Sequence, residues 1–182
     1  EVSKKILPLL QSEYTLVPTV QEMINTNTID DDQLRMMFVC CHPSLSAEAQ
    51  VCLILKTLCG FSVTEIAKSF VTGYDTIEKR LYRARQSFRE NNIQFDLPPV
   101  SELDSRLDNV LMAIYLLYIQ GYNSTQHKNL IRNDLISEAL RLCELINRCP
   151  GIKHTGTNAL IALICFNSSR NEARLDGHGN IL

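Results

Sequence analysis

The sequence GFSVTEIAKSFVTGYDTIEKRLYRARQSFRE, residues 60–90, combines a short helix, a tight turn and a longer basic helix. Residues 62–70 have the length and the apolar interior of a short helix, and the Val71-Thr72-Gly73 segment suits a turn. The helix that follows, over about residues 74–90, carries five cations with no acid between the first and the last: Lys79, Arg80, Arg83, Arg85 and Arg89. Two helices joined by such a turn, the second of them basic, are typical of a helix-turn-helix.

Apolar residues divide the second helix into two faces. Ile77, Leu81, Ala84 and Phe88 recur at four, three and four residues, so they share the face that packs on the preceding helices. The residues left pointing outward are Thr76, Glu78, Lys79, Tyr82, Arg83 and Gln86.

Such an outward face suits the major groove of DNA. Lysine and arginine reach guanine acceptors or phosphates, while tyrosine and threonine contact base edges and the backbone. Glu78 repels phosphate but can accept a hydrogen bond from a cytosine amino group, so we expect it to select sequence rather than add affinity. The flanking cations Arg80, Arg85 and Arg89 are better placed for phosphates.

Helical spacing continues through the rest of the chain, and no strand-like alternation persists, so the sequence predicts an all-α fold. Carboxylates at residues 30–32 suit the start of a helix that Pro43 stops, and Ser44 or Ser46 can cap the next, which ends at Gly60. The Asp96-Leu97-Pro98-Pro99 segment looks like a domain boundary. Three further helices are expected at about residues 101–120, 133–148 and 156–172.

Composition limits the possible functions. The chain has 182 residues, 45% of them hydrophobic, which is enough for a packed core. Its formal net charge of −2 excludes a protein that coats nucleic acid through bulk charge, so any such contact must be local. No apolar run approaches the roughly 20 residues that span a bilayer, and no signal peptide is recognisable, so we expect a cytoplasmic protein.

The cysteines and histidines give no pattern for catalysis or metal binding. Seven cysteines without a CxxC motif are expected to be reduced and mostly buried. Cys40 and Cys41 point about 100° apart on a helix and cannot easily converge on one zinc ion. His127, His154 and His178 lie in polar stretches without a hydrolase motif. We therefore expect no enzyme activity, cofactor or small-molecule substrate.

Two blocks of the sequence resemble a known family. Thr64-Glu65-Ile66-Ala67 and the TIEKRLYRAR stretch at residues 76–85 resemble region 4 of bacterial RNA polymerase sigma factors. The stretches DQLRMMFVCCHPSL (32–45) and EAQV (48–51) are similar to a subgroup of extracytoplasmic-function sigma factors that carry an added C-terminal helical domain. Further matches to that domain follow in order: IYLL (114–117), GY (121–122), RNDL (132–135), EALRL (138–142) and ARLD (173–176).

The resemblance implies a division of the chain and a function. Residues 1–31 would be the linker after region 2, a region that this sequence does not contain, as expected of a piece of a longer protein. Residues 32–92 would form region 4, a three- or four-helix unit like a winged helix without its wing. Residues 93–182 would form the added domain, for which a tetratricopeptide-like stack is one candidate architecture.

The same resemblance implies the partners. Region 4 of such factors reads the promoter −35 element, at positions that fall here on Thr76, Glu78, Lys79, Tyr82 and Arg83. It also packs on the flap of the polymerase β subunit through an apolar surface of its helices. The helices at residues 34–41 and 51–58 carry surplus apolar residues, which either the flap or the added domain could cover. We further hypothesise that the added domain gates region 4.

Two other classes of function remain open from the sequence. A stand-alone helix-turn-helix regulator would bind a palindromic operator as a dimer and would not engage the polymerase. A protein-interaction module would use the C-terminal helices as a scaffold, with the basic helix only solvated. Absence of DNA binding at low salt would favour the module, since even non-specific binding strengthens as salt falls.

Overall fold

The computed structural model describes residues 29, 31–93, 96–123 and 131–171, and this part of the chain forms helices and no strand. The all-α prediction is therefore confirmed. The helices are α2 (Asp32–Cys40), α3 (Ala47–Thr57), α4 (Val63–Ser69), α5 (Tyr74–Glu90), α6 (Val100–Tyr122), α7 (Asn133–Arg148) and α8 (Thr155–Ser168). The expected linker, except for residues 29 and 31, and the ARLD stretch at 173–176 lie outside the described residues.

Side chains near the helix ends explain where several helices begin and end. The Asp31 carboxylate accepts a hydrogen bond from the Leu34 amide at 2.8 Å and caps α2. Of the two serines expected to cap α3, Ser46 does so. Gly60 follows α3 with a φ of +72°, a left-handed conformation that glycine adopts without steric cost.

The helix-turn-helix is formed by α4, the turn after it and α5. A capping box starts α4: the Ser62 hydroxyl accepts from the Glu65 amide at 3.2 Å, and the Glu65 carboxylate accepts from the Ser62 amide at 2.7 Å. In the turn, Val71 has a φ of +51°, which is strained for a β-branched residue. Gly73 is the N-cap of α5, so that helix begins without a side-chain cap.

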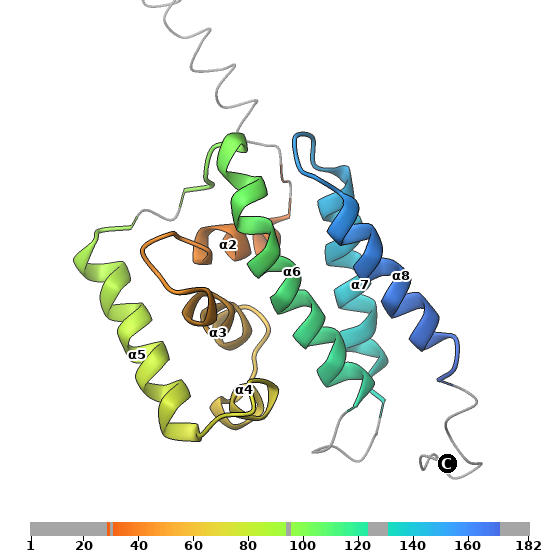
Figure 1. Ribbon diagram of the computed structural model, residues 1–182, viewed down its shortest axis with the longest axis horizontal. Helices are drawn as coiled ribbons and strands as arrows, with labels where there is room; N and C mark the ends of the chain where they lie inside the picture. Colours follow the sequence, from red (N-terminus) through yellow and green to blue (C-terminus); the bar gives the residue numbers. More distant parts are fainter. Residues whose placement is uncertain (1–28, 30, 94–95, 124–130, 172–182) are drawn as a thin grey trace, which may run out of the picture.

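Helix α6 lies at the centre of the molecule. It packs on α2 and α3 on one side and on α7 and α8 on the other, while α5 packs on α3 and α4, at the edge of the molecule away from α7 and α8 (Figure 1). Its buried residues belong to one continuous apolar core that joins both halves of the chain: Leu103, Leu107, Val110, Ala113, Ile114 and Leu117.

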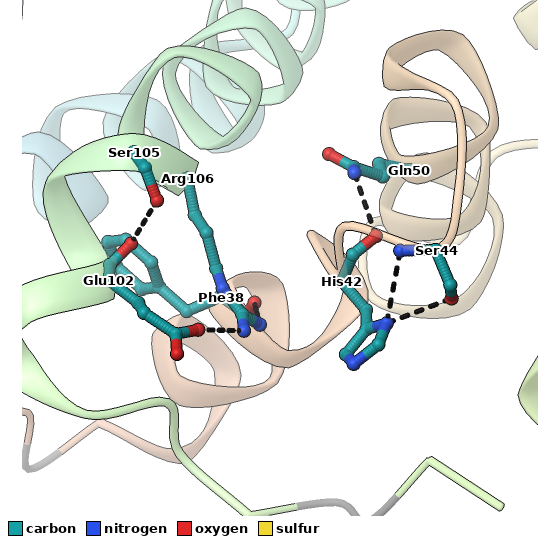
Figure 2. Close-up of polar contacts among 7 residues, drawn as sticks. All are labelled: Phe38, His42, Ser44, Gln50, Glu102, Ser105 and Arg106. Carbon is teal, nitrogen blue, oxygen red and sulfur yellow. Dashed lines mark hydrogen bonds and ion pairs between the residues drawn. The ribbon is translucent and has the colours of Figure 1, made fainter. Parts of the chain in front are cut away.

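Polar contacts fix α6 to the first two helices. The Arg106 guanidinium donates to the Phe38 carbonyl at the end of α2 at 3.2 Å and pairs with Glu102 at 2.6 Å (Figure 2). One turn further along α6, the Asn109 amide donates to the side-chain oxygen of Gln50 on α3 at 2.7 Å. Helix α6, the first of the three added helices α6–α8, is therefore attached to α2 and α3 by both apolar packing and hydrogen bonds.

Helix α7 makes a further attachment at the start of α2. The Arg141 guanidinium pairs with the Asp31 carboxylate at 2.6 Å and donates to the Gln33 side chain at 3.2 Å. It also pairs with Glu138 on its own helix at 2.7 Å. Asp31 thus caps α2 and binds α7 with the same carboxylate.

Candidate nucleic-acid interface

The apolar face of α5 holds the helix against its neighbours. Ile77, Leu81 and Ala84 are buried, and Phe88 is half-buried, as the four-three-four spacing predicts. Burial of these side chains on α3 and α4 leaves the opposite face of α5 in solvent, and the added helices do not cover it. The residues there are exposed: Thr76, Glu78, Lys79, Tyr82, Arg83, Arg85 and Gln86.

Arg80 differs from the other cations of α5. Its side chain is half-buried, with the guanidinium 5.6 Å from the centre of the Phe70 ring and 3.9 Å from the Cys52 sulfur. Both contacts lie on the inner side of α5, on α3 and at the end of α4. Arg80 therefore helps to hold α5 in place. Its cation–π contact with Phe70 could not be inferred from the position of Arg80 in the α5 sequence.

Lys79 and Arg83 form a ridge with a groove on each side. The first groove, of about 450 Å³, is also lined by Glu78, Tyr82 and Arg85, together with Lys56 of α3 and Val63 of α4. The second, of about 410 Å³, is bounded by Thr76, Arg80 and Ser87 and by the turn before α3, Ser44-Leu45-Ser46. Lys79 and Arg83 line both grooves, so they lie between them.

Three polar residues outside α5 also line these grooves, and no pattern in the sequence indicated that they would lie there. Lys56, Ser44 and Ser46 are distant from α5 in sequence, and only the packing of α3 on α5 brings them to the surface beside it. The Lys56 ammonium donates to the Phe61 carbonyl at 3.2 Å, which holds it next to the start of α4. Lys56 adds a cation to Lys79, Arg83 and Arg85 on this surface, and such a cluster attracts phosphate more strongly as the salt concentration falls.

Glu78 is held by a neighbour on its own helix. The Tyr74 hydroxyl donates to one Glu78 carboxylate oxygen at 3.0 Å, one helical turn away. This hydrogen bond is the main reason that the pKa of Tyr74 is raised above its usual value. The spacing of four residues could have indicated the contact, but tyrosine and glutamate at that spacing are too common to single out.

A separate apolar groove of about 310 Å³ opens between α2, α3 and the end of α5. It is lined mainly by Met36, Cys40, Leu53, Leu58 and Phe88, with the arginines 85 and 89 at its edge. The surplus of apolar residues on α2 and α3 is thus covered in part: α6 packs on one side of these helices, and this groove remains on another.

The Cys40-Cys41-His42 segment is structural. Burial raises the pKa of the Cys40 thiol to about 11 and that of Cys41 to about 12, so neither is a thiolate nucleophile at neutral pH. The His42 Nδ1 accepts from the Ser44 amide at 3.2 Å and stabilises the turn before α3. Of the other histidines, His154 is half-buried rather than exposed, and residues 127 and 178 lie outside the described residues.

Comparison with known protein families agrees with this geometry. Residues 35–88 match the model "Sigma-70, region 4". The chain contains a sigma-70 region 4 domain. Residues 106–182 match a second model, described as a "Family of unknown function (DUF6596)". The region 4 match thus lies within α2–α5, and the second family covers most of α6 with α7 and α8, so the resemblance to sigma region 4 followed by a further helical domain is confirmed.

One curated relative shares most of the chain. The "Uncharacterized protein R00370" of Rhizobium meliloti (strain 1021) is 34% identical over 152 residues, which are 84% of this chain and 36% of that protein. The chain therefore spans little more than a third of its relative's length. No solved structure matches the chain. Among the described helices, none has the length and apolar character needed to cross a membrane.

Proposed function

We propose that this chain is part of an extracytoplasmic-function sigma factor, acts in the cytoplasm and recognises the promoter −35 element through α5. The observation that carries the proposal is the exposed, cationic face of α5 within a sigma region 4 domain. Lys79 and Arg83 would enter the major groove with Thr76, Glu78 and Tyr82, while Arg85 would contact phosphates and Arg80 would support α5 from behind. The chain itself would catalyse no reaction and hold no cofactor.

We further propose that the apolar groove binds the flap of the polymerase β subunit. Its lining from α2, α3 and α5 is mainly apolar and does not include Lys79 or Arg83, so DNA and polymerase could be bound together, with Arg85 between the two surfaces. The flap would contribute an apolar segment whose burial drives association. Binding to the polymerase would then hold region 4 at the promoter.

The placement of α6–α8 narrows how the added domain could gate region 4. These helices contact α2 and α3 and leave the outward face of α5 exposed, so gating by direct cover of that face has no support. We propose that the added domain acts through α3 and α4, whose positions fix α5. Deletion of residues 96–182 would also uncover the sides of α2 and α3 on which α6 packs, so point changes at the interface are the better test.

The DNA proposal is tested by titration of a labelled duplex that carries a candidate −35 element, over a range of salt concentrations. Lys79→Ala and Arg83→Ala should each weaken binding, and loss of one phosphate contact lowers the salt slope by about 1. Arg148→Ala is the matched control, because Arg148 is also exposed but lies on α7. If neither Lys79→Ala nor Arg83→Ala changes DNA binding, the groove model is rejected.

The polymerase proposal is tested by anisotropy of the labelled chain with core RNA polymerase, with excess free flap fragment as competitor. Met36→Asp should abolish saturable binding, since it places a charge in the apolar groove, and should leave DNA binding unchanged. Met112→Asp is the control, because Met112 is an exposed methionine on α6. No binding of the unmodified chain at micromolar polymerase would favour a stand-alone regulator and a search for a palindromic operator.

A further inference from the structure

The first turn of α5 places two side chains in a fixed relation where a recognition helix reads bases. Tyr74 is the first residue of α5, and its hydroxyl donates to the Glu78 carboxylate at 3.0 Å. In a helix-turn-helix, residues near the start of the second helix contact base edges. Tyr74 is 49% exposed, so its ring lies on the surface beside Glu78 rather than in the core.

Glu78 has few other restraints. Within the described part of the chain, Tyr74 is the one side chain that hydrogen-bonds Glu78, and no cation forms an ion pair with it. An exposed glutamate has several rotatable bonds, and ordering it on binding costs conformational entropy. The Tyr74 hydroxyl occupies one carboxylate oxygen and leaves the second oxygen available as an acceptor.

We propose that Tyr74 is a positioning residue that orients Glu78 toward a cytosine amino group, and so sets the base preference at one position of the bound DNA. The inference rests on the DNA binding proposed above. A carboxylate in the major groove pairs with the cytosine N4 amino group and with no acceptor-only edge. The Tyr74 hydroxyl is protonated, and therefore a donor, at physiological pH, and the hydrogen bond to Glu78 raises its pKa further.

Glu78 and the cations of α5 contribute differently to DNA binding because their charges are opposite. Lys79 and Arg83 attract the DNA backbone regardless of sequence, whereas Glu78 opposes phosphate and contributes only where a donor faces it. A loss of Tyr74 should therefore change selectivity and leave non-specific affinity unchanged. A pair that only stabilised the α5 helix would change neither the preferred base nor its position.

The experiment is selection of duplexes from a library with a randomised 12-base-pair core, using the 182-residue chain at low ionic strength, followed by sequencing of the bound fraction. Tyr74→Phe removes the hydroxyl and keeps the ring. Glu78→Ala identifies the base pair that Glu78 reads, and Tyr115→Phe is the control, because Tyr115 is a half-buried tyrosine of α6, outside the proposed DNA interface. Thermal unfolding of each variant verifies that α5 remains folded.

We expect the unmodified chain to prefer cytosine at one position and Glu78→Ala to lose that preference. Tyr74→Phe should reduce the same preference by about 3- to 10-fold, the usual effect of one hydrogen bond, with an unchanged affinity for non-specific DNA. Tyr115→Phe should retain it. A full cytosine preference in Tyr74→Phe, or no position affected by Glu78→Ala, would overturn the inference and leave DNA binding intact. Absence of any DNA binding would instead overturn the proposed function, and the inference with it.

Discussion

The coupling energy between Asn109 of α6 and Gln50 of α3, whose side chains share a hydrogen bond, should indicate how firmly the added helices α6–α8 hold region 4. Gln50 is buried, and its amide donates to the carbonyls of His42 at 2.9 Å and Leu45 at 3.0 Å, while its oxygen accepts from Asn109 at 2.7 Å (Figure 2 shows the first of these). A single side chain thus closes the turn between α2 and α3 and connects that turn to α6. The two residues are 59 positions apart in the sequence, so their coupling reports tertiary structure alone.

The magnitudes follow from burial. Gln50→Ala removes three hydrogen bonds and deprives the buried Leu45 carbonyl of that donor, so we expect a loss of about 2–4 kcal/mol in the free energy of unfolding. Asn109 is half-buried, and water can replace part of its contact, so Asn109→Ala should cost about 1 kcal/mol. In the double variant the shared bond is lost only once, which gives a coupling energy of about 0.5–1.5 kcal/mol.

Urea unfolding of the four proteins, followed by circular dichroism, provides the assay. We expect one transition in each, since α6 and region 4 share a continuous core. Gln86→Ala is the control, because the Gln86 amide bonds only Glu90 on the exposed face of α5, and its effect should stay within about 0.5 kcal/mol. If the two changes are additive within about 0.3 kcal/mol, or if two separate transitions are seen, the added helices do not stabilise region 4 in this way.

Three further predictions test other features. Val71→Asn should raise the free energy of unfolding by about 1 kcal/mol, measured by urea unfolding, because asparagine tolerates the positive φ in the helix-turn-helix turn; an equal or lower value would contradict the strain. Burial and the Arg106 charge lower the pKa of His42, so its neutral form favours the fold, and its contribution is present above about pH 6.5 and lost as the pH falls through the lowered pKa. Unfolding midpoints from pH 7.5 to 5.5 should therefore decline more steeply than in His42→Asn, and equal slopes would refute this role. A thiol reagent should modify Cys165 quickly and the other cysteines slowly, because Cys165 is the exposed one, and Cys165→Ser should remove the fast phase.

Much of the fold was predictable because short-range patterns determine it. The spacing of Ile77, Leu81 and Ala84 gave the buried face of α5, and the exposed face followed from it. Gly60 after α3 was predictable from its freedom to take a positive φ. These features depend on residues within a few turns of one another, and helical periodicity carries that information directly.

The orientation of individual polar side chains was not predictable in the same way. Arg80 has the same charge as Arg83 and lies one turn from it, yet Arg80 turns inward over Phe70 while Arg83 stays exposed. The difference depends on where α3 and α4 pack against α5, which the α5 sequence does not contain. The Tyr74 hydroxyl likewise reaches Glu78 only in one set of rotamers, among several that the helix allows.

The surplus of apolar residues on α2 and α3 shows why the sequence left two possible covers open, the polymerase flap and the added domain. A hydrophobic face indicates that something covers it, but not whether the cover is another part of the same chain or a partner. Here both apply to different sides: α6 packs on α2 and α3 in the shared core, while Met36 and Leu53 line the open groove. α6 already occupies one side, and the groove and the ridge of α5 stay open for the two partners that we propose. The added domain thereby limits which surfaces of region 4 are available, without covering the face that we propose reads DNA.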